Sequence, residues 1–273
     1  MASQANATTN DNSDRRESGF TDFGDRWIYV FMAALFIATT LAGFIPDSLA
    51  KIAAVEAGQR APFPPVLHLH AVLMGAWLML LLTQSILMAT GRPARHKRLG
   101  ITSMFLAPAI VATGIVLVPT MYGQVWNAAQ SAPPEMAAQM DGMVWFMGNI
   151  ALLQIRAGLL FTLFVMLAVR ARKTDPGMHK RLMFLATIIP LQAAIDRITW
   201  LPHSFPEAAY SADLYVMAWI APMFLWDLFR LGRVHTAYVV WLAIYIPFAV
   251  VVNLLWGSDR WQGWVPGLMG YSS

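Results

Sequence analysis

The stretch VLHLHAVLMGAWLMLLLTQSILMA, from Val66 to Ala89, decides the fold class, because it is long, apolar and free of Asp, Glu, Lys and Arg. An α-helix of about 20 apolar residues is long enough to cross the hydrocarbon core of a bilayer. Across the chain, 58% of residues are hydrophobic and 12% are charged, compared with about 45–50% and about 25% in soluble domains. The sequence therefore predicts an integral membrane protein.

Similar apolar stretches recur along the chain, and together they predict an all-α, polytopic membrane helix bundle of about seven transmembrane helices. The expected spans are Trp27–Ile45, Val66–Ala89, Ile101–Met121, Val144–Arg170, Lys180–Leu201, Asp213–Leu228 and His235–Trp256. The membrane domain covers residues 27–256. Residues 1–26 are polar and predict a disordered cytoplasmic tail, and residues 257–273 form a short Trp/Gly-rich tail on the outer side.

The basic residues orient this bundle. Fourteen of the 19 Lys and Arg residues fall on one side of the predicted membrane, whereas the other side receives Lys51, Arg60 and Arg260. Cytoplasmic segments are enriched in Lys and Arg, so the amino terminus is predicted inside and the carboxyl terminus outside, in a bacterial inner membrane. The net charge of +4 follows from this topology, and no nucleic-acid partner is expected.

The tetrapeptide HKRL occurs twice, beginning at His96 and at His179, and a related LGRVH segment ends at His235. Each of the three histidines lies where the chain enters the membrane from the predicted cytoplasmic side. Basic side chains there extend to lipid headgroups, so one interpretation is lipid-interface anchoring or helix capping. The alternative is an inner-side haem or metal site made of two of these histidines.

A second set of candidate ligands lies toward the predicted outer side. His68 and His70 occupy the first two turns of the second span, where residues two apart point about 200° apart, and His203 follows the fifth span. His68 or His70 with His203 could ligate haem b. For copper, the same two histidines would combine with Met136, Met140 and Met143, because imidazole and thioether groups suit Cu(I). These methionines share one helical face with Met147, and gap-filling packing is the alternative interpretation.

Charged residues inside the predicted spans form a third feature. Asp196 and Arg197 are predicted to lie at the depth of His70, and Arg156 near the midplane. Each costs about 2.5–3.5 kcal/mol to insert, so we expect each to be paired or to face a wet cavity, and Asp196 could support a copper site. Arg156 could pair with Asp196 or with a helix-end carbonyl and hold the bundle together, or it could bind an anionic substrate. Asp227 is predicted to pair with Arg230 or Arg233 at the cytoplasmic boundary.

Four segments resemble a widespread family of uncharacterised bacterial multi-pass inner-membrane proteins. These are LHLHAVLMGAWLMLLLTQSILMA, RHKRLG, HKRLMFLAT and DLFRLGRVH, in that order between Pro65 and His235. Members carry a similar LHLH helix, an HRRLG-like turn, an HKRLM turn and a GRVH segment. The resemblance implies a multi-helix membrane fold without an established activity, and singles out His68, His70, His96, His179 and His235. There is a more distant similarity to membrane b-type cytochromes.

Three functional hypotheses remain open at this point. The first is a redox or metal-binding protein that carries haem b or copper on histidines of the outer leaflet and serves electron transport with a redox partner. The second is a non-catalytic accessory subunit that packs against other membrane subunits. The third is a transporter of a small anion or lipid that uses Arg156. All three place the protein in a lipid bilayer.

Overall fold

The computed structural model describes residues 2–271, and side chains from residue 21 onward, and every element in this part of the chain is helical. The prediction of an all-α bundle is confirmed. The elements in chain order are α1 (Ala2–Glu56), α2 (Pro65–Ala89), α3 (Pro93–Gly100), α4 (Ser103–Gln130), the 3-10 helix η1 (Pro134–Met136), α5 (Ala137–Ala171), α6 (Pro176–Ile195), α7 (Tyr210–Leu231), α8 (Thr236–Leu255) and α9 (Asp259–Leu268).

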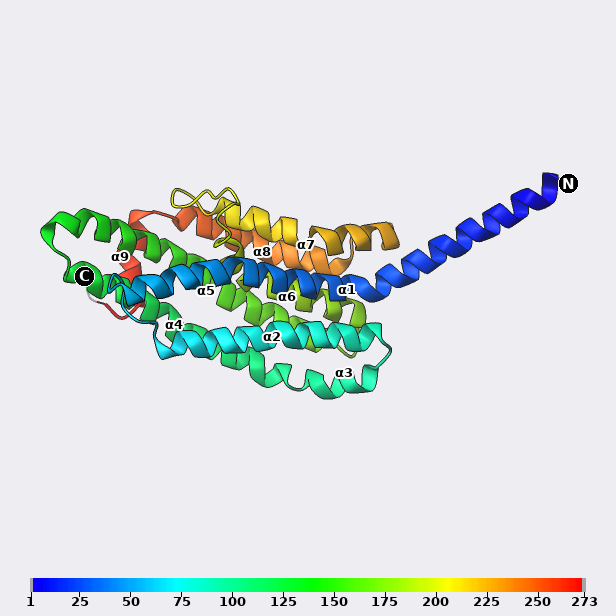
Figure 1. Ribbon diagram of the computed structural model, residues 1–273, viewed down its shortest axis with the longest axis horizontal. Helices are drawn as coiled ribbons and strands as arrows, with labels where there is room; N and C mark the ends of the chain where they lie inside the picture. Colours follow the sequence, from blue (N-terminus) through cyan, green and yellow to red (C-terminus); the bar gives the residue numbers. More distant parts are fainter. Residues whose placement is uncertain (1, 272–273) are drawn as a thin grey trace.

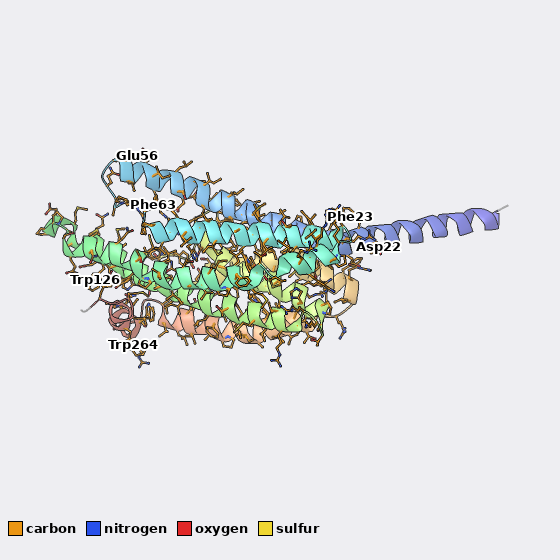
Figure 2. The ribbon with its side chains drawn as sticks, turned by 90° about the horizontal axis from the view of Figure 1, so that it is seen from below. Asp22, Phe23, Glu56, Phe63, Trp126 and Trp264 are labelled. Carbon is orange, nitrogen blue, oxygen red and sulfur yellow. The ribbon has the colours of Figure 1, made fainter. Side chains whose placement is uncertain are left out.

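The long helices run side by side, so the molecule has two ends (Figure 1). At the end that we call the basic end, α3 lies together with the last turns of α2, α5 and α7 and the first turns of α6 and α8. Figure 2 shows Asp22 and Phe23 toward this end, and Glu56, Phe63, Trp126 and Trp264 toward the opposite end. The two HKRL segments therefore meet at one end of the bundle.

Six helical stretches in the described residues are long and apolar enough to cross a membrane, as expected of a multi-pass membrane protein. They are Thr21–Glu56, Pro65–Ala89, Pro93–Gln130, Pro134–Ala171, Tyr210–Leu231 and Thr236–Leu255. The fifth predicted span, now α6, is not among them, because its first turns carry His179, Lys180 and Arg181.

Helix α6 is instead the centre of the bundle. It packs against α1, α5, α7 and α8, and most of its residues are buried, including the polar Arg181, Thr187 and Gln192. A helix that is covered on all sides is typical of a protein core. Its contact with α1 is close: a Cβ atom on Gly43 would lie 2.0 Å from the carbonyl oxygen of Ala194, so only glycine fits there.

The end of α6 differs from the sequence prediction in a way that affects the candidate site. Helix α6 ends at Ile195, not at Leu201, and Asp196 is its C-cap residue. The cause lies in the backbone, since the Arg197 amide bonds to the carbonyl of Ala194 in an i→i−3 turn. Asp196 and Arg197 consequently lie in the turn that leaves α6, rather than inside a membrane helix.

The predicted terminal tails also contain helix. The predicted outer tail contains α9, whose Trp261 and Val265 are buried against the bundle. Residues 2–26 are part of α1, and the first part of this helix projects away from the bundle (Figure 1). That these residues form a mobile tail stays a prediction.

Candidate functional sites in the bundle

The two histidines of α2 that were predicted on the outer side have different environments. His68 is exposed and lies edge-on to Phe63, with ring centroids 6.1 Å apart. His70 faces α4, where its Nδ1 lies 2.9 Å from the hydroxyl oxygen of Thr113. That hydroxyl already donates its proton to the carbonyl oxygens of Ala109 and Ile110, so His70 Nδ1–H donates to the Thr113 hydroxyl. His70 therefore links α2 to α4.

His203 lies in the connection between α6 and α7 and is stacked on Phe205, with ring centroids 6.2 Å apart. Its Nε2 lies 3.3 Å from the carbonyl oxygen of Ile198, to which it donates. No interaction in residues 21–271 links His203 to His68 or His70. The structure therefore does not bring together the predicted outer haem pair.

The methionines of the predicted copper site lie at the start of α5. Met136 is the N-cap residue of this helix, and Met136 and Met143 are exposed whereas Met140 is half-buried. None of the described interactions joins this face to His68 or His70. Among the described residues, no group of three or more His, Asp or Glu side chains is arranged to hold a metal ion.

The histidines of the two HKRL copies, in contrast, contact each other. The ring centroids of His96 on α3 and His179 on α6 are 6.5 Å apart, and the ring planes are nearly perpendicular at 80°. The contact joins residues 83 positions apart in the sequence. We call these two side chains the histidine pair.

A hydrogen bond orients the His179 ring of the histidine pair, and another holds the His96 backbone. His179 Nδ1 lies 2.8 Å from the carbonyl oxygen of Ala168, and because a carbonyl only accepts, His179 carries its proton on Nδ1 and leaves Nε2 with a lone pair. Gln84 donates to the backbone carbonyl of His96 at 3.1 Å and thereby ties α2 to α3. His96 Nδ1 and Gln84 Oε1 are buried with no hydrogen-bond partner among the described side chains.

A polar network centred on Arg156 crosses the interior between α5, α6, α7 and α8. Arg156 is only 2% exposed; its Nη1 donates to Asp213 Oδ1 at 2.6 Å and its Nη2 to Gln192 Oε1 at 2.7 Å. Tyr245 donates its hydroxyl to the same Asp213 oxygen at 2.7 Å, and its ring lies 5.1 Å from the Arg156 guanidinium carbon. The predicted Arg156–Asp196 pair is therefore wrong: the partner is Asp213.

The network continues toward the loop after α6. Gln192 Nε2 lies 3.4 Å from Asp196 Oδ2, while Arg197 pairs with Asp47 on α1 at 3.1 Å. Three buried polar atoms here lack a partner within residues 21–271: Arg156 Nε, Asp196 Oδ1 and His203 Nδ1. Asp213 was not predicted as a member of this network, because it stands at the start of an apolar stretch and was interpreted only as the boundary of that stretch. The hydrogen bonds of Gln192 and Tyr245 within the network were not predicted either.

A second buried ion pair lies at the basic end. Arg181 on α6 donates to both oxygens of Asp227 on α7, from Nε at 2.7 Å and from Nη2 at 2.5 Å, and Tyr238 on α8 donates to Asp227 Oδ2 at 2.5 Å. The predicted pairing of Asp227 with Arg230 or Arg233 is therefore wrong. Asp227 faces the bundle interior, and Arg230 pairs with Asp25 at 2.8 Å.

His235 is the N-cap residue of α8, where its Nδ1 accepts a hydrogen bond from the amide of Ala237 at 3.1 Å. Partial burial, with the nearby Arg181 as a further cause, lowers the pKa of His235 and favours the neutral ring that can accept this bond. Of the interpretations given to the three basic-end histidines, helix capping thus applies to His235.

No family model, curated protein or solved structure matches this chain. The resemblance to the multi-pass family therefore stays a prediction.

Proposed function

We propose that the protein is a membrane redox protein that binds haem b between His96 and His179. The observation that carries the proposal is the histidine pair itself. Axial ligation of one haem requires a histidine from each of two helices on opposite faces of the porphyrin, and His96 and His179 come from α3 and α6.

The separation of the rings supports shared ligation of one metal. A metal–imidazole bond measures about 2.0 Å, so two imidazoles on opposite sides of one ion have ring centroids about 6 Å apart. The observed centroid distance is 6.5 Å. The bond from His179 Nδ1 to the Ala168 carbonyl is the kind of outer-shell contact that fixes the tautomer of a ligating histidine.

The surroundings discriminate between candidate metals. A structural zinc site requires four protein ligands, and the described residues offer no cluster of three His, Asp or Glu. Two imidazoles could hold Cu(I), but basic side chains flank the pair: Arg98 follows His96 by two positions, and Arg172 lies near His179. Haem fits this basic setting better than a bare cation, because its propionates are negative. When bound, haem would supply one-electron chemistry.

The test is the haem, iron and copper content of the protein purified from bacterial membranes. We expect stoichiometric haem in the wild type, loss of haem in His96→Ala and His179→Ala, and retention in the controls His70→Ala and His203→Ala. Haem loss confined to the two control variants would overturn the assignment to α3 and α6. A wild type that contains no haem after expression with added haem would overturn the proposal altogether.

The Arg156 network favours a second candidate function, proton passage. Both terminal nitrogens of Arg156 are already bonded, and Asp213 balances its charge, so an additional anion gains little there. The unpartnered Asp196 and His203 atoms can instead accept a proton or a water molecule. This site supports movement of protons better than the anion transport suggested by Arg156 alone.

Proton flux into proteoliposomes under an imposed pH gradient tests this candidate. Asp196→Asn removes a titratable group of the network and should abolish flux, whereas Asp47→Asn, near the same end but bonded to Arg197 and Lys51, should leave it largely intact. Equal flux in Asp196→Asn and wild type would contradict proton passage through this network.

A further inference from the structure

A cavity of about 220 Å³ opens at the basic end between α1, α6 and α7, separate from the histidine pair. Its wall is formed by the following side chains: Asp25, Ile28, Tyr29, Lys180, Arg181, Trp226, Asp227, Arg230 and Leu231. Two of the protein's ion pairs, Asp25–Arg230 and Arg181–Asp227, are part of this wall. The cavity thus contains three basic groups and two carboxylates, an excess of one positive charge.

The carboxylates of the cavity already have their partners. Arg230 donates to both oxygens of Asp25, from Nε to Oδ1 at 3.0 Å and from Nη2 to Oδ2 at 2.8 Å. The indole of Trp226 also donates to Asp25 Oδ1, at 3.0 Å. Asp227 accepts from Arg181 and from Tyr238. A metal cation would have to displace these donors, so the cavity is not suited to a cation.

Two donors of the cavity, in contrast, have no acceptor among residues 21–271. The Lys180 ammonium lies 4.7 Å above the ring of Tyr29 and forms no hydrogen bond or ion pair in this part of the chain. The hydroxyl of Tyr29 is buried with no partner among the same residues, and the residue is 8% exposed. A buried hydroxyl without a bond is costly, so this atom indicates a ligand that the cavity is built to receive.

We propose that this cavity binds a singly charged phosphate group, through the Lys180 ammonium and the Tyr29 hydroxyl. A phosphate diester has acceptor oxygens and no donors, and its single negative charge matches the excess positive charge. It makes strong, charge-assisted hydrogen bonds with an ammonium group. The site adds specific recognition to the general attraction that a basic membrane face exerts on anionic lipid. The phosphate can belong to a phospholipid headgroup or be free in solution.

The experiment measures lipid retention by native mass spectrometry after delipidation and titration with phosphatidylglycerol or phosphatidylcholine. A parallel arm titrates inorganic phosphate and follows thermal stability. The variants are Lys180→Ala and Tyr29→Phe, which removes only the hydroxyl. Matched controls are Lys97→Ala, an exposed lysine on α3 at the same end, and Tyr210→Phe, an exposed tyrosine at the opposite end.

We expect one tightly retained phosphatidylglycerol in the wild type, and about tenfold or greater weakening in Lys180→Ala and Tyr29→Phe, as for the loss of one charge-assisted hydrogen bond. Lys97→Ala and Tyr210→Phe should bind as the wild type does. If inorganic phosphate binds with the same variant pattern and phosphatidylglycerol does not, the phosphate assignment holds and the source is the solution. Equal weakening by Lys97→Ala and Lys180→Ala, or no binding of either probe, would overturn the proposal.

Discussion

The Arg181–Asp227 pair joins α6 to α7, and through Tyr238 it also reaches α8. Both charged side chains are buried. The attraction within such a pair is offset by the cost of removing two charges from water, so its net contribution to stability is small. Removing one partner is different, because the other charge stays buried and unpaired.

Asp227→Asn should therefore lower the free energy of unfolding by about 3–5 kcal/mol, the typical cost of breaking a buried pair. Unfolding by sodium dodecyl sulfate in mixed micelles, followed by circular dichroism, measures the change. Lys51→Gln is the control: it breaks the partly exposed i,i+4 pair with Asp47, for which we expect about 0.3–0.5 kcal/mol. Equal losses for both variants would contradict a structural role for Asp227.

The sequence predicts the burial of Arg156, from its position in an apolar stretch, but it places Asp227 at the cytoplasmic boundary, whereas Asp227 is buried. The partners of both residues were not predicted, because Asp213 and Arg181 lie 57 and 46 residues away. Only helix packing determines such pairs. Helix packing also brings the two HKRL histidines together, although the repeated motif already marked both of them as candidate site residues.

Among the elements, α8 begins at a titratable cap. The cap exists while His235 Nδ1 is neutral, and protonation removes its lone pair. Because the pKa of His235 is lowered in the fold, the folded state binds fewer protons than the unfolded state between the two pKa values. The contribution of His235 is therefore complete above its ordinary pKa of about 6.5 and is lost as the pH falls through the lowered value.

His235→Ala should destabilise the protein by about 1 kcal/mol at pH 8, as for the loss of an N-cap. The difference between wild type and variant should shrink toward pH 5. Thermal unfolding of both proteins across this pH range tests the prediction. A difference that grows as the pH falls would have the wrong sign for a neutral cap.

Helix α9 packs on α5 mainly through Trp261, assisted by Val265 and Gln262. Trp261 is 6% exposed, and its indole donates to the Gly148 carbonyl at 2.7 Å, whereas Trp264 on the same helix is 60% exposed. Trp261→Ala should lower the free energy of unfolding by about 3–5 kcal/mol or release α9 from the bundle. Trp264→Ala should change the free energy of unfolding by no more than about 0.5 kcal/mol. Limited proteolysis of residues 257–271 and unfolding measurements compare the two. Similar protease resistance and stability of both variants would contradict docking of α9.

The presence of the long helices was largely predictable, because hydrophobic runs of about 20 residues in a membrane protein have few alternatives to helix. The end of α6 was not, since the apolar residues after Asp196 continue into a loop. Helix α9 was missed because it is only ten residues long and its Trp residues also fit an interfacial belt.

For the whole molecule, the orientation in the membrane is still a prediction from Lys and Arg. Because the chain has no cysteine, single substitutions can report it without background. Ser131→Cys, after α4, should react with a membrane-impermeant maleimide in cells whose inner membrane is intact. Lys173→Cys, between α5 and α6, should react only after permeabilisation. The reverse pattern would invert the assignment of the basic end to the cytoplasm.

Composition and charge distribution predict the architecture of the molecule, whereas the choice of functional centre depends on which helices become neighbours. His68, His70 and His203 share a predicted depth but face different partners: His70 faces α4, and His203 faces Phe205 and Tyr215. His96 and His179 are brought together by the contact of α3 with α6, which no local pattern specifies.

The most direct test of a haem centre at the histidine pair is the dithionite-reduced minus oxidised optical spectrum of the purified protein, compared with that of His179→Ala. We expect a Soret band in the wild type that sharpens and shifts on reduction, with α and β bands of a six-coordinate b-type haem, and loss of this signature in His179→Ala. An identical spectrum in wild type and His179→Ala would contradict haem binding at the histidine pair.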